Sequence, residues 1–381
     1  MENYDLPGNG LPEQYQQYQP PANDYDITQD PVMLRKRIKK GYGWTGLAMI
    51  LQFVFALAVS MIIAFAYSTI KTTEYMSEHT GASQAQLMQF TQKLSQDLVT
   101  DAKYNNIVNT LAYLIANLSA AAIGIAAVKA FKSKDLFRKS KRDAKWIALG
   151  VLGALGIQAV SVFVQTIMIN ITGLMGISEN TASLAGMSDD VILNLIILLY
   201  FVIIAPVTEE FLMRGLIMNS LAPVNRKFAL IASALLFGIM HGNFNQMFNG
   251  FLLGLIFGYI ALKSGSIIPS IIAHMTVNAN VILCTYVYEY TVFEAFGEDA
   301  ASICEMAHFA VLLVIGIIAL IFFLKKNGKI SQEDMVVPEY SYEIAPAEKK
   351  KLTWGLLAKC PSVWIVTIIY VIFAIASVNV I

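Results

Sequence analysis

Long uninterrupted apolar runs, separated by short polar stretches, dominate the chain. A helix that crosses a membrane needs about 20 consecutive apolar residues, and runs of that kind recur from end to end. They predict nine membrane-spanning segments, of which the run at 228–241 is the shortest and could be buried inside a bundle. The nine predicted spans are 44–67, 105–128, 146–174, 191–222, 228–241, 244–262, 266–289, 306–324 and 361–381.

The fold class follows from the continuity of these runs. Only helices and closed barrels satisfy every backbone group in lipid, and continuous rather than alternating apolar runs favour helices. Composition agrees, because 56% of the 381 residues are hydrophobic and 14% are charged, whereas soluble domains carry about 25% charged residues. We therefore predict an all-α polytopic transmembrane bundle. A net charge of zero gives no indication of a nucleic-acid partner.

The distribution of basic residues predicts the orientation. With the N-terminus in the cytoplasm, all but four of the 27 Lys and Arg residues fall in cytoplasmic segments. The exceptions are Lys71, Lys93 and Lys103 in outer loops and Arg214 inside a span. This is a strong positive-inside bias. It favours nine spans, a cytoplasmic N-terminus and a C-terminus outside.

The polar ends and loops suggest four regions. Residues 1–34 contain no Lys or Arg and are rich in Pro, Gln and Asn, so they cannot bury enough apolar surface to order. A basic cluster follows and ends at Lys40. The four regions are a disordered acidic tail with its basic cluster (1–40), N-terminal helices (41–180), a core with the candidate site (181–290) and C-terminal helices with a cytoplasmic loop (291–381).

Ionisable residues inside the apolar run at 191–222 indicate a site. Burying Glu209, Glu210 and Arg214 at that depth of the membrane costs free energy. Ionisable residues inside a span therefore suggest a functional site. Glu210 and Arg214 are four apart and can pair on one helical face, whereas Glu209 is rotated about 100° away. One carboxylate is then neutralised and the other stays available. Pro206 removes a backbone donor just before them and predicts a kink.

The next spans add two imidazoles and an amide. Phe237 and His241 share one helical face, and His274 and Asn278 share another. A Glu close to a His can hold a water molecule and remove its proton. A second His and an Asn can donate hydrogen bonds to a carbonyl oxygen as it becomes negative. With Glu209 as the base, these groups suit attack of water on an amide.

Other chemistries are compatible with the same residues. Glu209, His241 and His274 could bind Zn²⁺ with an open fourth position, although H-E-x-x-H spacing is absent because Gly-Asn-Phe-Asn follows His241. Ser270 and His274 could form a nucleophilic dyad. The three cysteines have no C-x-x-C spacing and give no metal signature. A purely structural ion-pair network and a proton-coupled transporter are further alternatives.

Three short motifs carry a family resemblance. E-E-x-x-x-R at 209–214, F-x-x-x-H at 237–241 and H-x-x-x-N at 274–278 occur in that order, together with A-P-x-x-E-E, R-G and S-A-L-L-F. The stretch at about 190–280 resembles the CPBP family, which comprises type II CAAX prenyl endopeptidases and bacterial relatives, also called Abi proteins. Met213 stands where the family often has an aromatic residue.

The resemblance implies an all-helical intramembrane protease core. In it, Glu209 and His241 activate water, and His274 and Asn278 stabilise the oxyanion. The residues expected to support them are Glu210, Arg214 and Phe237. Family members have been described as metalloproteases and as glutamate proteases, so Zn²⁺ at Glu209, His241 and His274 stays open.

The resemblance also suggests substrate and location. Eukaryotic members cut prenylated CAAX peptides, and bacterial relatives are linked to peptide maturation, bacteriocin immunity and protein partnering. We expect an integral protein of a bacterial plasma membrane that cleaves a membrane-associated peptide or protein. The alternative is a non-catalytic scaffold on the same fold that binds another membrane protein.

Overall fold

The structure is a computed structural model that describes residues 31–179, 190–337, 342 and 346–380. The chain divides into two units, 1–37 and 38–381. Most of the tail predicted to be disordered lies outside the described residues. Residues 31–34, which we also expected to be disordered, are helical and begin the first helix.

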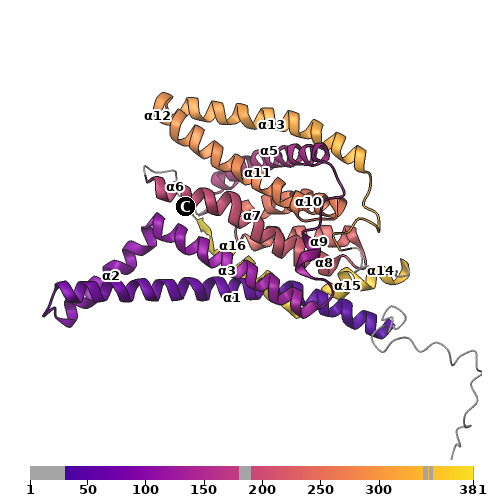
Figure 1. Cartoon of the computed structure of the whole chain (residues 1–381). Helices are drawn as coiled ribbons and strands as arrows, with labels where there is room; N and C mark the ends of the chain where they lie inside the picture. Colours follow the sequence, from indigo (N-terminus) through magenta and orange to yellow (C-terminus); the bar gives the residue numbers. More distant parts are fainter. Residues whose placement is uncertain (1–30, 180–189, 338–341, 343–345, 381) are drawn as a thin grey trace, which may run out of the picture. The chain divides into compact units, whose positions relative to one another are not determined.

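Helices make up almost all of the described chain (Figure 1). Labels with η mark π-helical segments, in which the backbone winds more widely than in an α-helix. The elements in chain order are α1 (Pro31–Glu78), α2 (Gln84–Thr100), α3 (Ala102–Val128), α4 (Ser133–Leu136), α5 (Ala144–Leu174), β1 (Ile177–Glu179), α6 (Val191–Leu198), η3 (Leu199–Ile204), α7 (Ala205–Glu210), η4 (Phe211–Met218), α8 (Asn219–Leu221), α9 (Arg226–Met240), α10 (Phe244–Ser264), α11 (Ile268–Cys284), η5 (Thr285–Val292), α12 (Phe293–Phe296), α13 (Glu298–Asn327), α14 (Pro346–Leu352), α15 (Trp354–Leu357), α16 (Pro361–Ala376) and β2 (Val378–Val380).

The helical class is confirmed, and the span count differs from nine. In the described part of the chain, seven helices are long and apolar enough to cross a membrane, or eight if a bent pair counts as one span. That pair is Glu348–Leu357 with Pro361–Ala376, bent by 47°. The predicted span at 228–241 is α9, whose 15 residues reach only about 22 Å. Most of α9 is buried in the protein. The cytoplasmic N-terminus stays a prediction.

Two features were not predicted. Helix α2 lies in the expected outer loop after span one, and none of its residues is buried. Ser83 caps it with a reciprocal capping box to Gln86, which satisfies two otherwise unpaired donors. The short strands β1 and β2 pair antiparallel, with Ile177 opposite Val380. They tie the end of α5 to the residues after α16.

Glycines set the close packing of α9 on α10. A Cβ added at Gly254 would lie 3.0 Å from the Cα of Ala234, and one at Gly250 would lie 3.0 Å from the Cα of Gly238. Both distances are too short for ordinary side chains, so the two backbones approach closely only because these positions are glycine. The approach places α10 against the helices that carry the site.

A polar clamp holds the segment after α13 against the end of α10. Lys263 Nζ donates to Asp334 Oδ2 at 2.7 Å and to Lys329 O at 3.0 Å. The Lys263 and Asp334 side chains are 5% and 13% exposed. Burial raises the pKa of Asp334, but the hydrogen bonds from Lys263 and Ser331 and the charge of Lys263 together outweigh burial, so the pKa lies below its usual value. The clamp is therefore an ionic contact that depends on the ionised carboxylate.

Candidate active site

The helix that carries the carboxylates runs from α6 through α8 and changes its winding around Pro206. Pro206 is in the first turn of α7, between π-helical segments η3 and η4. The N–H of Ala205 donates to the carbonyl of Tyr200, five residues back. The helix therefore meets the proline with wide turns on both sides. These segments are frequent at functional sites.

Glu210 and Arg214 form the predicted pair. Arg214 Nη1 donates to Glu210 Oε1 at 2.7 Å, and the Arg214 and Glu210 side chains are 1% and 0% exposed. Arg214 Nη2 donates to Gly254 O on α10 at 3.0 Å. The guanidinium carbon lies 4.6 Å from the ring centroid of Phe237 and 5.5 Å from that of Phe257. This cation is thus held by a carboxylate, a carbonyl and two aromatic rings.

His274 joins the same carboxylate from α11. Its Nδ1 lies 3.0 Å from Glu210 Oε1, and because an ionised carboxylate only accepts, Nδ1 carries the proton and donates. Its Nε2 faces the other carboxylate, 3.8 Å from Glu209 Oε2. The ring stacks on Phe257 with centroids 4.7 Å apart. Glu210 therefore orients the ring of His274 and sets its tautomer, because the hydrogen bond at one ring nitrogen determines which nitrogen carries the proton.

Glu209 is left available, as predicted. Its side chain is 18% exposed, and its carboxylate lies beside the imidazole of His274. In the described residues Arg214 forms its ion pair with Glu210 and none with Glu209. The two neighbouring carboxylates thus have different partners, which gives them different chemistry.

His241 lies at the end of α9, against the ring of Phe237. Its Nδ1 lies 2.8 Å from Phe237 O, a carbonyl that only accepts, so Nδ1 donates and Nε2 is left as an acceptor in the neutral ring. The Phe237 ring meets His241 and His274 edge-on, with centroids 5.0 and 5.7 Å apart. No hydrogen bond or ion pair joins His241 directly to Glu209 across the described ranges. The structure brings Glu209 together with His274 instead.

Asn278 makes a contact that sequence reasoning did not anticipate. Its Nδ2 donates to the backbone carbonyl of Phe201 in η3 at 2.8 Å. One N–H of the amide is therefore committed to the backbone of the carboxylate helix. The oxyanion role that the resemblance implies for Asn278 stays a prediction.

The alternative chemistries find less support. Within the ranges that the structure describes, no three His, Cys, Asp or Glu side chains are placed to hold a metal ion. Zn²⁺ at Glu209, His241 and His274 stays a prediction, and no step below is routed through a metal. The Ser270 hydroxyl donates to Ile267 O at 2.8 Å, which engages it with its own helix rather than with His274.

Two tyrosines and one amide near Glu209 were missed. The Glu209 carboxylate interacts electrostatically with the phenols of Tyr113 on α3 and Tyr200 on η3. Asn117 Nδ2 donates to Thr208 Oγ1 at 3.0 Å and ties α3 to α7. The only sequence signal was Asn117 inside an apolar run. Tyrosines are too common in such runs to stand out.

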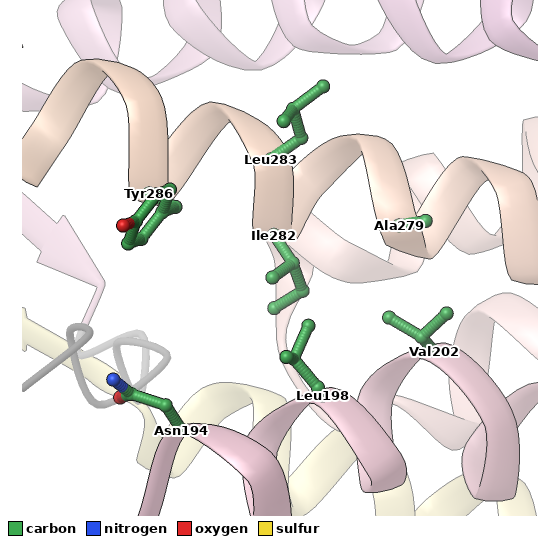
Figure 2. Close-up of a pocket in the computed structure, with 7 residues that line it drawn as sticks. All are labelled: Asn194, Leu198, Val202, Ala279, Ile282, Leu283 and Tyr286. Carbon is green, nitrogen blue, oxygen red and sulfur yellow. The ribbon is translucent and has the colours of Figure 1, made fainter. Parts of the chain in front are cut away.

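An apolar cavity of about 410 Å³ lies between the carboxylate helix and the α11–η5 helix. Figure 2 shows Leu198 and Ile282 pointing toward each other across it, with Asn194 and Tyr286 at one end. The remaining lining residues are Val202, Ala279 and Leu283. Val202 and Ala279 directly follow Phe201 and Asn278, so the cavity begins beside their hydrogen bond.

The fold and the site define a helical membrane protein with a cluster of carboxylates, imidazoles and a guanidinium buried among its spans. Residues 191–280 match the family model of Type II CAAX prenyl endopeptidase Rce1-like proteins. The chain therefore carries a domain of this CPBP family, which confirms the resemblance.

One curated relative is a protein of Bacillus subtilis (strain 168) named "Putative membrane peptidase YdiL". It is 27% identical over 155 residues, which cover 39% of this chain and 62% of the relative. The match thus spans less than two thirds of the relative's length. No solved structure matches the chain.

Proposed function

We propose that the protein is an intramembrane endopeptidase that hydrolyses a peptide bond of a membrane-associated peptide or protein. The observation that carries the proposal is the contact between Glu209 and His274. A carboxylate and an imidazole face each other at 3.8 Å, and a second carboxylate fixes the far side of the imidazole. The peptidase names of the family and the relative support the same activity.

Charge balance supports proton transfer at this contact. Glu209, Glu210 and Arg214 carry two negative charges and one positive charge when all are ionised. Buried charges are costly unless they are compensated. One proton shared between Glu209 and His274 makes the set neutral. A pair that shares one proton can take a proton from water and later return it, which is what amide hydrolysis requires.

The distances leave room for the attacking water. A hydrogen bond is about 2.8 Å long, so one water can contact both Glu209 Oε2 and His274 Nε2 across their 3.8 Å separation. The Nε2 of a neutral His241 can accept a further hydrogen bond from this region. We propose that Glu209, with His241, removes a proton from the water as its oxygen attacks the carbonyl carbon. The C–N bond then breaks as the same proton passes to the amide nitrogen.

His274 supplies the positive side of the reaction in this proposal. With Nδ1 bound to Glu210, its Nε2–H in the protonated ring points toward Glu209 and the reacting centre. It can donate to the carbonyl oxygen as negative charge develops there. Arg214 acts indirectly by holding Glu210 in place.

The apolar cavity suits the substrate class. Its lining is aliphatic along most of its length, and it starts beside the Asn278 hydrogen bond. The apolar part of a membrane-associated substrate can bury there while its peptide bond reaches Glu209. The CAAX peptides named in the family description are one such class.

The test compares cells that express the wild-type chain with cells that express Glu209→Gln. New N- and C-termini of membrane proteins, identified by mass spectrometry, should appear with the wild type only. The matching peptide is then assayed with purified protein in proteoliposomes. We expect the rate to fall by about 10²–10⁴-fold in the variant, because it loses its general base.

Glu74→Gln is the matched control. Glu74 is half exposed and pairs with Lys71 at 2.8 Å, far from the site in the chain. It should produce the same termini as the wild type. Equal termini from Glu209→Gln would remove Glu209 as the base. The scaffold alternative would be favoured if neither the wild type nor Glu209→Gln produces new termini and both copurify with a membrane protein in a stoichiometric ratio.

A further inference from the structure

The carbonyl of Phe201 lacks both of the donors that its helix would normally offer. In an α-helix it would accept from the N–H of Ala205, but that N–H donates to Tyr200 O. In a π-helix it would accept from residue 206, which is a proline with no N–H. The carbonyl of Phe201 therefore receives neither of these two backbone hydrogen bonds.

Asn278 supplies the missing donor from another helix. Its Nδ2 donates to Phe201 O at 2.8 Å. In a membrane span an unpaired carbonyl is costly, because no bulk water is there to satisfy it. The proline and the asparagine thus form a complementary pair, although 72 positions separate them in the sequence.

The same face of α11 also carries His274, one turn before Asn278. His274 bonds to Glu210, nine residues after Phe201. Two hydrogen bonds, one on each side of Pro206, therefore connect α11 to the carboxylate helix. Two separated contacts restrict both the sliding and the rotation of one helix against the other, whereas one contact would leave a pivot.

We propose that Asn278 is a positioning residue that pairs with the proline-exposed carbonyl and thereby sets the distance between Glu209 and His274. This inference rests on the proposed function for its link to turnover, and it assigns Asn278 a role through the backbone rather than contact with the reacting oxygen. The consequence is specific. If residue 206 again has a backbone N–H, this N–H should donate to Phe201 O and make the hydrogen bond from Asn278 unnecessary.

The test is a double-mutant cycle of Asn278→Ala and Pro206→Ala in the full-length protein. Asn278→Ala should lower the thermal midpoint by about 2–4 °C, as expected for one lost buried hydrogen bond. It should reduce production of the termini identified above by about 10- to 100-fold, because small displacements of reacting groups are that costly. In the Pro206→Ala background, both losses should shrink severalfold.

A second readout does not require turnover. The chain has four histidines, so ¹⁵N-labelled imidazoles in nanodiscs can be assigned by single substitutions. Asn278→Ala should shift the His274 nitrogen signals away from those of an Nδ1–H ring bound to a carboxylate. Pro206→Ala should return them. These signals and the midpoints stand even if Glu209→Gln shows that the proposed activity is wrong.

Asn280→Ala is the matched control on the same helix. Asn280 bonds to Gln158 and His308 instead of Phe201, so its effect on the midpoint should be equal in both backgrounds. The proposal is overturned if Pro206→Ala rescues neither the midpoint nor the His274 signals. It is also overturned if these are rescued while turnover stays lost, since Asn278 would then act on the reacting oxygen.

Discussion

Replacing Glu210 by Gln tests the electrostatic core of the site. The change keeps the size of the side chain and removes the charge between Arg214 Nη1 at 2.7 Å and His274 Nδ1 at 3.0 Å. Removing one partner of a buried ion pair costs about 3–5 kcal/mol. The glutamine oxygen still offers Arg214 a neutral acceptor worth about 1 kcal/mol. We therefore expect the free energy of unfolding to fall by about 2–4 kcal/mol.

The same substitution should change the tautomer of His274. The glutamine amide can donate to Nδ1, which places the ring proton on Nε2 instead. Nε2 can still donate in this neutral ring, but without the Glu210 carboxylate the ring loses the positive charge that the proposed step uses. Replacing the carboxylate of a comparable carboxylate–histidine pair by an amide costs about 10⁴-fold, so we expect turnover to fall by about 10²–10⁴-fold.

Two measurements check these numbers. Unfolding by SDS in mixed micelles, followed by the fluorescence of the four tryptophans, gives the change in stability relative to wild type. The ¹⁵N signals of the His274 ring report the tautomer. Glu74→Gln, the same chemical change at an exposed ion pair, is the reference. The reasoning fails if Glu210→Gln unfolds at the same SDS fraction as this reference and keeps the Nδ1–H form of His274.

Two further predictions concern other parts of the molecule. The pKa of Asp334 lies below its usual value because Lys263 and Ser331 together outweigh burial, so these contacts stabilise the fold above about pH 4 and are lost as pH falls through the lowered pKa. Unfolding midpoints at pH 3–7 should therefore fall with acid more steeply in wild type than in Asp334→Asn. Gly250→Ala would place a Cβ 3.0 Å from His241 Nδ1, so it should impair turnover and cost about 1–3 kcal/mol. Gly258→Ala meets the movable end of a leucine side chain at 2.5 Å and should largely preserve turnover in the same assay.

Contacts within one helix were predictable from spacing. Glu210 and Arg214 are four residues apart, and the structure pairs them as helical geometry requires. The same geometry predicted that Glu209 would face another direction. These inferences need only the helical repeat, which a continuous apolar run already indicates.

Contacts between helices were not predictable in the same way. Which face of α11 meets Glu210 depends on how α11 is rotated, and that rotation is set by packing against several helices. The sequence therefore placed His274 near the carboxylates without showing that it bonds to Glu210. The hydrogen-bond partner of Asn278 was even harder to predict, because it depends on the π-helical winding before Pro206.

The span count shows another limit of reading hydropathy. Residues 228–241 are as apolar as a lipid-facing helix, but α9 is short and largely enclosed by protein. A buried helix and a membrane-facing helix need the same residue types. Length separates them better than composition does.

Helix α1 has a consequence for how this protein can be studied. Its 48 residues correspond to about 72 Å of α-helix, whereas a bilayer with its headgroups is about 40–45 Å thick. Even tilted by about 40°, the largest angle usual for such helices, the helix must project into water. Its polar end near Lys71 is a ready handle for a spectroscopic label. Such a label would report the inclination of the helix from a position outside the candidate site.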